Sequence, residues 1–384
     1  MDVLLNPSFW WAAGTVTLAV WLAIAAIAAY NLRHISWLSP VAPRAGSEAL
    51  ISVIIPVRNE ARDIAAALRS VLAQEGVRLE IIAVNDHSSD HSGAILDEAA
   101  GGDPRLRVIH DPPLLPGWLG KANAMRAGLA AATGDYVLFT DADVIHAPRC
   151  FVSALVEMSD RQYDMISCLP LIRVRLFWEY AMLPMSVSAL AKLVPEKRQQ
   201  DRRVPDAAAS GSLILMKREV LRRLGGLEVI KGSLADDMTL ARQAKRHGFA
   251  TGYRFAPELM SMQLYKRNRE AFVSSSKNIL IVIEKSIWLA PAVPLFTFML
   301  CWSPWIMMIL GCARGDPALA LAGLACYGTA YASLFASRRI LAFRPLPALI
   351  FPLTFFIVSY CISRAFMLHL RGSIEWRGRV IRVR

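Results

Sequence analysis

The stretch Gly134-Asp-Tyr-Val-Leu-Phe-Thr-Asp-Ala-Asp143 is the segment around which the rest of the chain is best interpreted. Residues 136–139 are apolar and favour β-structure, so they predict one short buried strand. The run stops at Asp141 and Asp143, two carboxylates separated by a single residue. Such a pair in the loop after a strand can ligate a hard cation such as Mg²⁺ or Mn²⁺, which commonly also holds substrate phosphates. The alternative is an ordinary acidic turn, because aspartate favours turns.

Strand-like and helix-like segments alternate on both sides of this stretch. The predicted strands are 51–55, 79–84, 106–110, 136–139 and 211–216, and the predicted helices are 64–72, 91–100, 121–132, 218–224 and 234–247. This alternation predicts an α/β fold, in which a mostly parallel sheet has helices on both faces. Ligands of such sheets bind beyond the carboxyl ends of the strands. Polar clusters follow the first, second and fourth predicted strands, which is where that rule places a site.

Long apolar segments flank the globular region. Of the 384 residues, 55% are hydrophobic, whereas soluble domains are about 45–50% apolar. Residues 9–30 carry no charge and are long enough to cross a hydrocarbon core about 30 Å thick. We therefore expect four parts: an N-terminal transmembrane anchor at 1–32, a globular domain at 49–285, about three C-terminal transmembrane helices within 286–370, and a basic tail at 371–384.

The distribution of arginine predicts the orientation of the chain. Arg33 and Arg44 follow the first apolar segment, so the positive-inside rule places the globular domain in the cytoplasm. One N-terminal and three C-terminal crossings would then place the tail outside, yet the tail is rich in arginine. Either the first C-terminal apolar segment, which contains Pro291, Pro294 and Pro304, is re-entrant, or another crossing is miscounted.

One apolar segment inside the globular region has a different character. Within 172–195, the stretch 176–193 is apolar apart from Glu179 and Lys192 and contains Pro184. Arg173 and Arg175 precede this stretch, and further basic residues follow it at 197, 198, 202 and 203. An apolar helix with charged flanks favours a position in the membrane interface over a full crossing. A helix of the protein core is the alternative.

The net charge of +12 raises the question of a nucleic-acid partner. Much of this charge lies in arginine clusters beside apolar segments, a pattern that suits anionic lipid headgroups. We find no basic stripe interleaved with aromatic residues, so we expect no nucleic-acid partner.

Taken together and in order, the polar clusters resemble those of a membrane-bound family 2 glycosyltransferase with a GT-A fold. Residues 56–60, Pro-Val-Arg-Asn-Glu, are similar to the family's first nucleotide-binding loop. The resemblance assigns Pro56 and Glu60 to nucleotide binding, with Glu60 near the uridine. The cluster at 85–90 resembles the second loop, which would bring Asp86 to the base.

The remaining motifs of the resemblance concern the sugar diphosphate. Lys121 belongs to a Gly-Lys-x-x-Ala element and would lie near the diphosphate, while Asp141 and Asp143 match the metal motif for Mg²⁺ or Mn²⁺. Asp236 and Asp237 stand where the family has Glu-Asp, and the second carboxylate is the usual catalytic base. Asp236 is a departure, because it is shorter than the more common glutamate.

The resemblance implies an activity. The form of the 116–121 element and the segments at 264–278 and 375–379 look closest to the branch that glycosylates lipids, such as carotenoid, hopanoid-associated and ceramide glycosyltransferases. The implied function is inverting transfer of one sugar from a nucleoside diphosphate sugar, for example a UDP-hexose, to a hydroxyl of a membrane lipid acceptor. It further implies a multi-pass protein of the cell inner membrane, with the 49–285 domain as the cytoplasmic catalytic domain.

Two other functions stay open from the sequence. One is a processive polysaccharide synthase, although residues 263–267 lack the tryptophan of the Gln-x-x-Arg-Trp motif of polymer synthases. The other is a membrane scaffold that binds a nucleotide sugar without turnover. Retention of Asp141, Asp143 and Asp237 favours an enzyme over such a scaffold.

Overall fold

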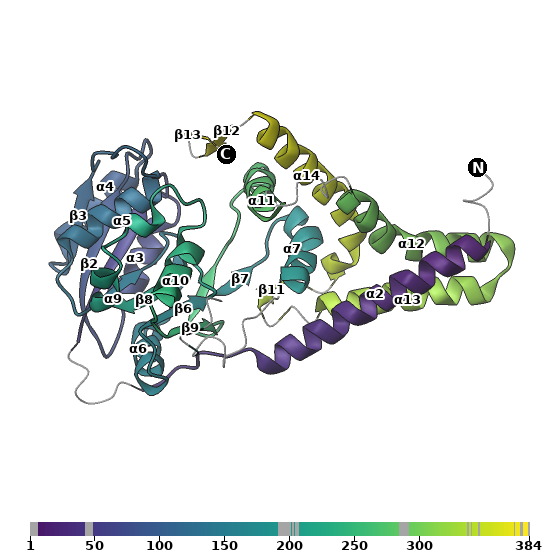
Figure 1. Cartoon of the computed structure of the whole chain (residues 1–384), viewed down its shortest axis with the longest axis horizontal. Coiled ribbons are helices and arrows are strands. Elements are labelled where there is room, and N and C mark those ends of the chain that lie inside the picture. The colour runs from purple at the N-terminus through teal and green to yellow at the C-terminus, as the bar shows by residue number, and fades with distance from the viewer. Residues whose placement is uncertain are drawn as a thin grey trace. The chain divides into compact units, whose positions relative to one another are not determined.

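The computed structural model describes residues 7–42, 49–190, 201, 203, 207–283, 292–335, 338, 340–344, 346–371, 373–376 and 379–382. The chain divides into two compact units, whose elements are labelled in Figure 1. One unit comprises 34–172 and 193–262 and is called the sheet unit below. The other comprises 1–33, 173–192 and 263–384 and is called the helical unit.

A seven-stranded sheet organises the sheet unit, with the strand order β3-β2-β1-β4-β8-β6-β9. Its strands are β1 (Leu50–Val57), β2 (Arg78–Asn85), β3 (Leu106–His110), β4 (Tyr136–Phe139), β6 (Met165–Leu169), β8 (Ile214–Lys217) and β9 (Thr251–Phe255). Pairing is parallel throughout except where β8 runs antiparallel to β4 and β6. The short strands β5 (Val144–His146), β7 (Leu171–Arg173) and β10 (Met260–Met262) form a second ladder, in which β10 is antiparallel to β5 and parallel to β7.

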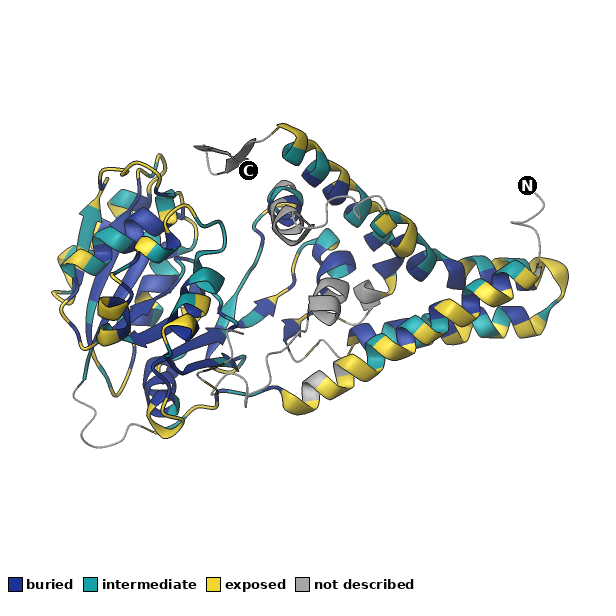
Figure 2. Ribbon diagram, viewed as in Figure 1, coloured by how far each residue is buried: buried dark blue, intermediate teal, exposed yellow. Residues whose placement is uncertain are grey.

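Helices cover both faces of the main sheet, as predicted from the alternation of elements. They are α3 (Ile64–Leu72), α4 (Ser92–Gly102), α5 (Gly120–Ala131), α6 (Cys150–Asp160), α9 (Arg218–Arg223), η1 (Glu228–Ile230) and α10 (Asp236–Arg246). Successive residues of a strand point to opposite faces, so adjacent residues of β1 serve two cores. Val53 packs with α3, α4 and α6, and Ile54 packs with α5, α9 and α10. Figure 2 shows the strands buried between these layers.

Two sequence-based boundaries are corrected by the structure. Pro56 lies in β1 rather than in the following loop, and it is in register with Val84 of β2. The backbone groups of Ile54 face β4, since its carbonyl accepts from the Thr140 N–H, and Pro56, two residues on, faces the same way. β4 has already ended there, so the missing N–H of Pro56 costs no ladder hydrogen bond.

The strand predicted at 211–216 begins later, at Ile214. Gly211 and Ser212 precede it in a turn, where their polar groups are used by the candidate site described below. A sequence pattern cannot distinguish an apolar strand start from a small-residue turn that leads into it.

The helical unit contains four helices that are long and apolar enough to cross a membrane, among the residues that the structure describes. The helices of this unit are α2 (Pro7–His34), α7 (Phe177–Leu190), α11 (Asn268–Ile283), α12 (Ala292–Arg314), α13 (Pro317–Phe335), η4 (Leu346–Leu353) and α14 (Thr354–Arg371), and its strands are β11 (Leu341–Ala342), β12 (Ser373–Trp376) and β13 (Arg379–Arg382). The four spanning-length segments lie at 8–27, 292–314, 317–335 and 349–371. One N-terminal and three C-terminal apolar helices agree with the sequence prediction.

Two details of the helical unit bear on the predicted topology. α12 continues through Pro304 as one helix of 23 residues, which disfavours the re-entrant alternative for this segment; Pro291 lies outside the described residues. Over the described residues, α7 extends for 14 residues, a length too short to cross a hydrocarbon core at a rise of about 1.5 Å per residue. Lys192, at the end of the predicted interfacial segment, lies outside the described residues.

Candidate active site

The strand order reverses direction between β1 and β4, because β2 and β3 follow on one side and β8 on the other. In open α/β sheets such a reversal opens a crevice at the carboxyl ends of the strands, where ligands bind. The loop after β1 carries Glu60, and the loop after β4 carries Asp141 and Asp143. These predicted site residues therefore follow the two strands that flank the reversal.

Lys121 is surrounded by carboxylates. It is the second residue of α5, and its Nζ lies 2.7 Å from Oδ1 of Asp141 and 3.5 Å from Oδ2 of Asp236. Desolvation alone would lower the pKa of Lys121, but the charges of Asp141, Asp236 and Asp237 outweigh it and hold that pKa above its ordinary value. The ammonium group is therefore fully charged at neutral pH and is held at the end of the β4 strand.

Asp237 lies in the first turn of α10, as predicted. Its Oδ2 accepts a hydrogen bond from the Gly211 N–H at 3.1 Å, and its Oδ1 accepts one from the Met238 N–H at 2.7 Å. Burial raises the pKa of Asp237 above its ordinary value, and the neighbouring charge of Asp236 adds to this, although the Lys121 ammonium opposes it. The carboxylate is thus oriented by two backbone groups and has an increased affinity for a proton.

Gly211 lies between these groups and was not singled out from the sequence. A Cβ atom at this position would meet Lys121 Nζ at 2.8 Å and Asp141 Oδ2 at 3.0 Å. Its N–H also donates to Asp237, so the absence of a side chain allows one backbone segment to touch both charged groups. The small-residue run Ser210-Gly-Ser212 before a strand is the sequence signal that could have indicated such a close approach.

The turn that bears Asp141 is fixed by buried polar groups. The Thr140 hydroxyl donates to the Ser212 carbonyl at 2.7 Å and lies 3.3 Å from Nε2 of His146. Burial lowers the pKa of His146 to about 4, so the imidazole is neutral at physiological pH. These contacts join the 140–143 turn to the segment that contains Gly211. Asp143 is half-buried and directly precedes β5.

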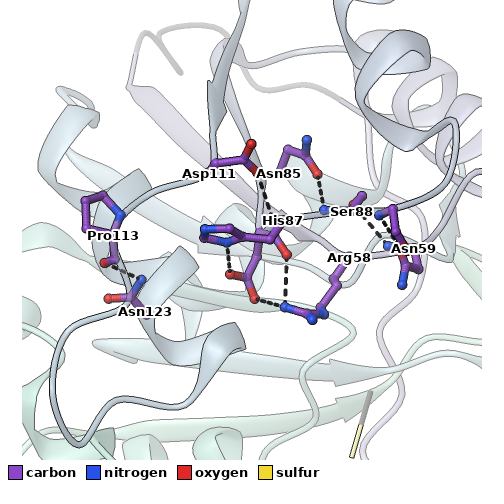
Figure 3. A network of polar contacts seen from close by, with 10 residues as sticks. Arg58, Asn59, Asn85, His87, Ser88, Asp111, Pro113 and Asn123 are labelled. Carbon is purple, nitrogen blue, oxygen red and sulfur yellow. Dashed lines mark hydrogen bonds and ion pairs between the residues drawn. The ribbon is translucent and has the colours of Figure 1, made fainter. Parts of the chain in front are cut away.

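Asp86, which directly follows β2, makes a second set of polar contacts. Its side chain is almost completely buried. Nη1 of Arg58 lies 3.4 Å from Oδ2 of Asp86 and donates to the Asp86 carbonyl at 3.2 Å, while Nδ1 of His87 lies 3.1 Å from Oδ1. Figure 3 shows Arg58 and His87, the two partners of this carboxylate, close to each other. The sequence did not indicate that Arg58 would be its ion-pair partner.

The loops after β1, β2 and β3 are tied to one another (Figure 3). Asn59 Oδ1 accepts from the Ser89 N–H at 2.8 Å, and Asp111 Oδ1 accepts from the His87 N–H at 3.0 Å. Asn59, His87 and Asp111 all have positive φ, between 46° and 56°, a region that asparagine and aspartate tolerate better than most residues. The three loop ends therefore form one pre-organised polar surface.

Glu60 is also buried and joins the same surface through its backbone. Its N–H donates to the Ser92 hydroxyl at 2.8 Å, and its carbonyl accepts from Asp63 and Ile64 at the start of α3. The structure thus brings the predicted residues together in two sets. Lys121, Asp141 and Asp237 lie around Gly211, with Asp236 against Lys121, and Glu60 and Asp86 belong to the linked loops.

The side chains of Asp141 and Asp143 in the 140–143 turn could serve as ligands of a divalent cation. No group of three or more His, Cys, Asp or Glu side chains that could hold a metal is found in the described part of the chain. Mg²⁺ commonly uses only one or two carboxylates and takes its other ligands from water and substrate phosphates. The oxygen-only pair of Asp141 and Asp143 fits such a cation, and the carboxylates near Lys121 outnumber its single positive charge.

Residues 52–225 match the family described as "Glycosyl transferase family 2". An undecaprenyl-phosphate 4-deoxy-4-formamido-L-arabinose transferase of Pectobacterium carotovorum subsp. carotovorum (strain PC1) is 39% identical over 119 residues, which are 30% of this chain and 35% of that protein. An uncharacterized glycosyltransferase, EpsJ, of Bacillus subtilis (strain 168) is 34% identical over 119 residues, which are 31% of this chain and 33% of that protein. The match thus spans about a third of the length of these curated relatives.

Among solved structures, the mannosyltransferase PcManGT from Pyrobaculum calidifontis, in complex with GDP-Man and Mn²⁺, is similar with a TM-score of 0.53. The alignment covers 94% of this chain and 98% of that one at 20% sequence identity, so the likeness concerns the fold alone. It confirms the fold class expected from the sequence, an α/β GT-A sheet accompanied by one N-terminal and three C-terminal apolar helices. Residues 52–225 therefore match glycosyl transferase family 2, and the fold of the chain is of the GT-A type.

Proposed function

We propose that the chain is an inverting glycosyltransferase, which moves one sugar from a nucleoside diphosphate sugar to a hydroxyl of a membrane lipid. The observation that carries this proposal is the grouping of Lys121, Asp141 and Asp237 around Gly211. A cation for a departing diphosphate and a carboxylate for an attacking hydroxyl are the two groups that a single displacement requires.

Asp237 is the proposed general base. Its raised pKa lies closer to that of an acceptor hydroxyl than an ordinary carboxylate's does, which favours proton transfer. As the proton passes to a carboxylate oxygen of Asp237, the acceptor oxygen bonds to the anomeric carbon and the bond to the diphosphate breaks. One displacement of this kind inverts the anomeric configuration.

Lys121 is the proposed counter-charge of the leaving group. Its ammonium is fixed between Asp141 and Asp236, so it can interact with the negative charge that develops on the diphosphate without moving far. A Mg²⁺ or Mn²⁺ ion, held by Asp141 and Asp143, would supply further neutralisation of the diphosphate. The pair has the oxygen-only chemistry that such an ion prefers.

The linked loops after β1, β2 and β3 are the proposed nucleotide site. The almost completely buried Asp86 carboxylate would hold Arg58 and His87 in place beside the base, and these two more exposed side chains would contact its edge. Pro56 and Glu60 lie at the end of β1, where they help to shape the same surface. Positive-φ residues and inter-loop hydrogen bonds hold this surface before any ligand arrives, which reduces the entropy lost on binding.

The apolar helices of the helical unit support a lipid acceptor. Four segments of spanning length would keep the chain in the membrane, and a lipid substrate is concentrated there. We place the protein in the cell inner membrane with the sheet unit in the cytoplasm, because Arg33 and Arg44 follow the first apolar helix.

A lipid phosphate is the second candidate acceptor. The undecaprenyl-phosphate arabinose transferases among the relatives, 39% identical over 119 residues in one case, favour it. A phosphate oxygen is already ionised at neutral pH and needs no general base, whereas a hydroxyl does. The two acceptors therefore differ in how strongly transfer depends on Asp237.

The proposal is tested by measuring release of nucleoside diphosphate from a panel of UDP- and GDP-sugars by the purified chain. Release that requires an added membrane lipid extract is the expected result. Release at the same rate without lipid indicates hydrolysis of the donor and contradicts lipid transfer.

A further inference from the structure

The apolar helix α14 contains an arginine well inside its sequence. Arg364 lies within the segment 349–371, one of those long and apolar enough to cross a membrane. It precedes Arg371, the last residue of the helix, by seven residues, or about 10 Å along the axis. A guanidinium group at this depth is costly unless it has a partner, which makes such residues candidates for a binding role.

The structure gives Arg364 no such partner on its own helix, and α14 contains no aspartate or glutamate. Its Nη1 atom is buried, and it has no hydrogen-bond partner in the described part of the chain. An unsatisfied donor of this kind requires a ligand or water to offset the loss of hydration.

Helical spacing aligns Arg364 with three other residues. Tyr360, Met367 and Arg371 are four residues before, three after and seven after it, so they share its face of the helix. Tyr360 and Met367 are 55% and 51% exposed. The Tyr360 ring also contacts Phe272 of α11 edge-on, with centroids 5.4 Å apart, which fixes the ring one turn before Arg364. This set is called the α14 arginine face.

The chemistry of the α14 arginine face matches an amphiphile with an anionic head. Guanidinium groups bind phosphate oxygens in a two-pronged geometry, and tyrosine and arginine favour the headgroup level of a bilayer. The large apolar side chains Phe356 and Leu370 are 53% and 70% exposed on the same helix, where acyl chains can cover them.

We propose that the α14 arginine face binds the phosphate of an anionic bilayer phospholipid, with Arg364 as the main ligand and Arg371 as the second. This site is separate from the proposed transfer reaction. It involves none of the residues assigned to the donor or to catalysis, and binding there is measurable without a sugar donor.

The test uses the delipidated full chain in detergent, titrated with dioctanoyl phosphatidylglycerol or, separately, with dioctanoyl phosphatidylcholine. Native mass spectrometry reports the fraction of protein that retains each lipid. Wild type and the charge-matched control Arg314→Gln, at the end of α12, are expected to prefer the anionic lipid. Arg364→Gln is expected to lose affinity for it by roughly tenfold, the effect of one hydrogen-bonded charge. Arg371→Gln should lose less.

Arg364→Lys is a control for misfolding of Arg364→Gln. It keeps the positive charge and should keep part of the preference for phosphatidylglycerol over phosphatidylcholine. Equal retention of the two lipids by wild type, or unchanged phosphatidylglycerol binding by Arg364→Gln, overturns the proposal. A third titration adds a polyprenyl phosphate to the phosphatidylglycerol complex. Displacement one for one at low concentration would assign the face to an acceptor lipid and overturn the phospholipid assignment, whereas persistence of the bound phospholipid supports it.

Discussion

At the scale of single residues, Asp237 offers the sharpest test of the proposed chemistry. Asparagine is nearly isosteric and can still accept from one of the Gly211 and Met238 N–H groups, but it cannot take a proton. Loss of a general base typically costs about 10²–10⁴ in rate, and loss of a helix-end charge only about 0.3–1 kcal/mol of stability. Asp237→Asn should therefore remain in the membrane fraction, bind the donor nucleotide and transfer almost no sugar, as measured by nucleotide titration and product formation.

Asp236→Asn is the matched control and should be milder, because the Asp236 carboxylate pairs with Lys121 rather than serving as the proposed base. Wild-type turnover by Asp237→Asn would remove Asp237 from the role of base and would favour a lipid phosphate as acceptor. Loss of nucleotide binding together with transfer would instead show that the residue is structural.

The pH dependence of transfer provides an independent test of Asp237. A general base acts in its ionised form, so activity should fall as the pH drops through the pKa of Asp237, which is raised by burial and by Asp236. The acid limb of the kcat/KM profile should therefore lie above the ordinary aspartate range of about 3.9. Asp236→Asn removes a negative charge that raises the pKa of Asp237, so the limb should move to lower pH. A shift to higher pH would contradict the assigned electrostatics.

Gly211→Ala tests the close approach at the centre of the site. The new Cβ would meet Lys121 Nζ at 2.8 Å and Asp141 Oδ2 at 3.0 Å, so both charged groups must move. Misplacement of reacting groups by about 1 Å can cost roughly 10²-fold in rate. The side-chain ends at Gly211 need to shift by less than this, so kcat should fall by less than about 10²-fold, without loss of the folded protein. Gly101→Ala is the control, because nothing lies within 4 Å of a Cβ there. Equal activity of the two variants would show that Gly211 does not shape the site.

Single-residue features differed in how far the sequence could predict them. Asp141 and Asp237 belong to short motifs whose position after a strand or at a helix start is a local property, so the sequence could place them in the fold, while their roles stay predictions. Gly211 and Arg58 were not, because their importance depends on contacts with residues 26 to 90 positions away. Local patterns carry no information on which distant side chain a backbone segment approaches.

At the scale of elements, the loops after β1, β2 and β3 should act together. Asn59 has φ of 56° and accepts a hydrogen bond from the Ser89 N–H. Asn59→Ala loses this bond and strains the backbone, whereas Asn59→Gly loses only the bond, and left-handed backbone costs an alanine about 1–2 kcal/mol. Thermal unfolding should rank wild type above Asn59→Gly and Asn59→Ala last, with donor KM rising in the same order. If Asn59→Gly unfolded at a lower temperature than Asn59→Ala, backbone strain would not explain the effect of the alanine.

The turn between β4 and β5 is the element on which metal dependence rests. If Asp141 and Asp143 hold Mg²⁺ or Mn²⁺ with the diphosphate, treatment with EDTA should abolish transfer and either ion should restore it. Asp143→Asn should raise the metal concentration that gives half-maximal activity, because it removes one charged ligand. Full activity of the purified, metal-stripped enzyme would contradict the assignment of Asp141 and Asp143 as metal ligands.

Most elements of the sheet unit could be predicted, because an apolar run or a 3.6-residue periodicity is a strong local signal. Pro56 was assigned to a loop, since a proline normally ends a central strand. It is tolerated only because β4 stops opposite Ile54, a fact of register that no local pattern contains. β8 was predicted too early for a similar reason, as small residues before Ile214 serve the site rather than the ladder.

At the scale of the whole molecule, the orientation of the chain in the membrane can be measured by cysteine labelling. Cys312 near the end of α12 is exposed, whereas the other five cysteines are buried. In intact spheroplasts, a membrane-impermeant maleimide should label Cys312 and should not label a cysteine placed at exposed Glu98 of α4 in a Cys312→Ser background. Labelling of position 98 without permeabilisation would place the sheet unit outside the cytoplasm, away from the cytoplasmic nucleotide sugars, and would contradict the proposed orientation.

Transfer of a single sugar to a lipid is the central claim, and it is measured most directly on the product. Membrane vesicles that contain the chain are incubated with isotopically labelled nucleoside diphosphate sugars, and the extracted lipids are analysed by mass spectrometry. We expect a lipid that carries one labelled sugar, formed by wild type and absent with Asp237→Asn. A ladder of lipids or polymers with many sugars, or no labelled lipid with any donor that the protein binds, would contradict the account.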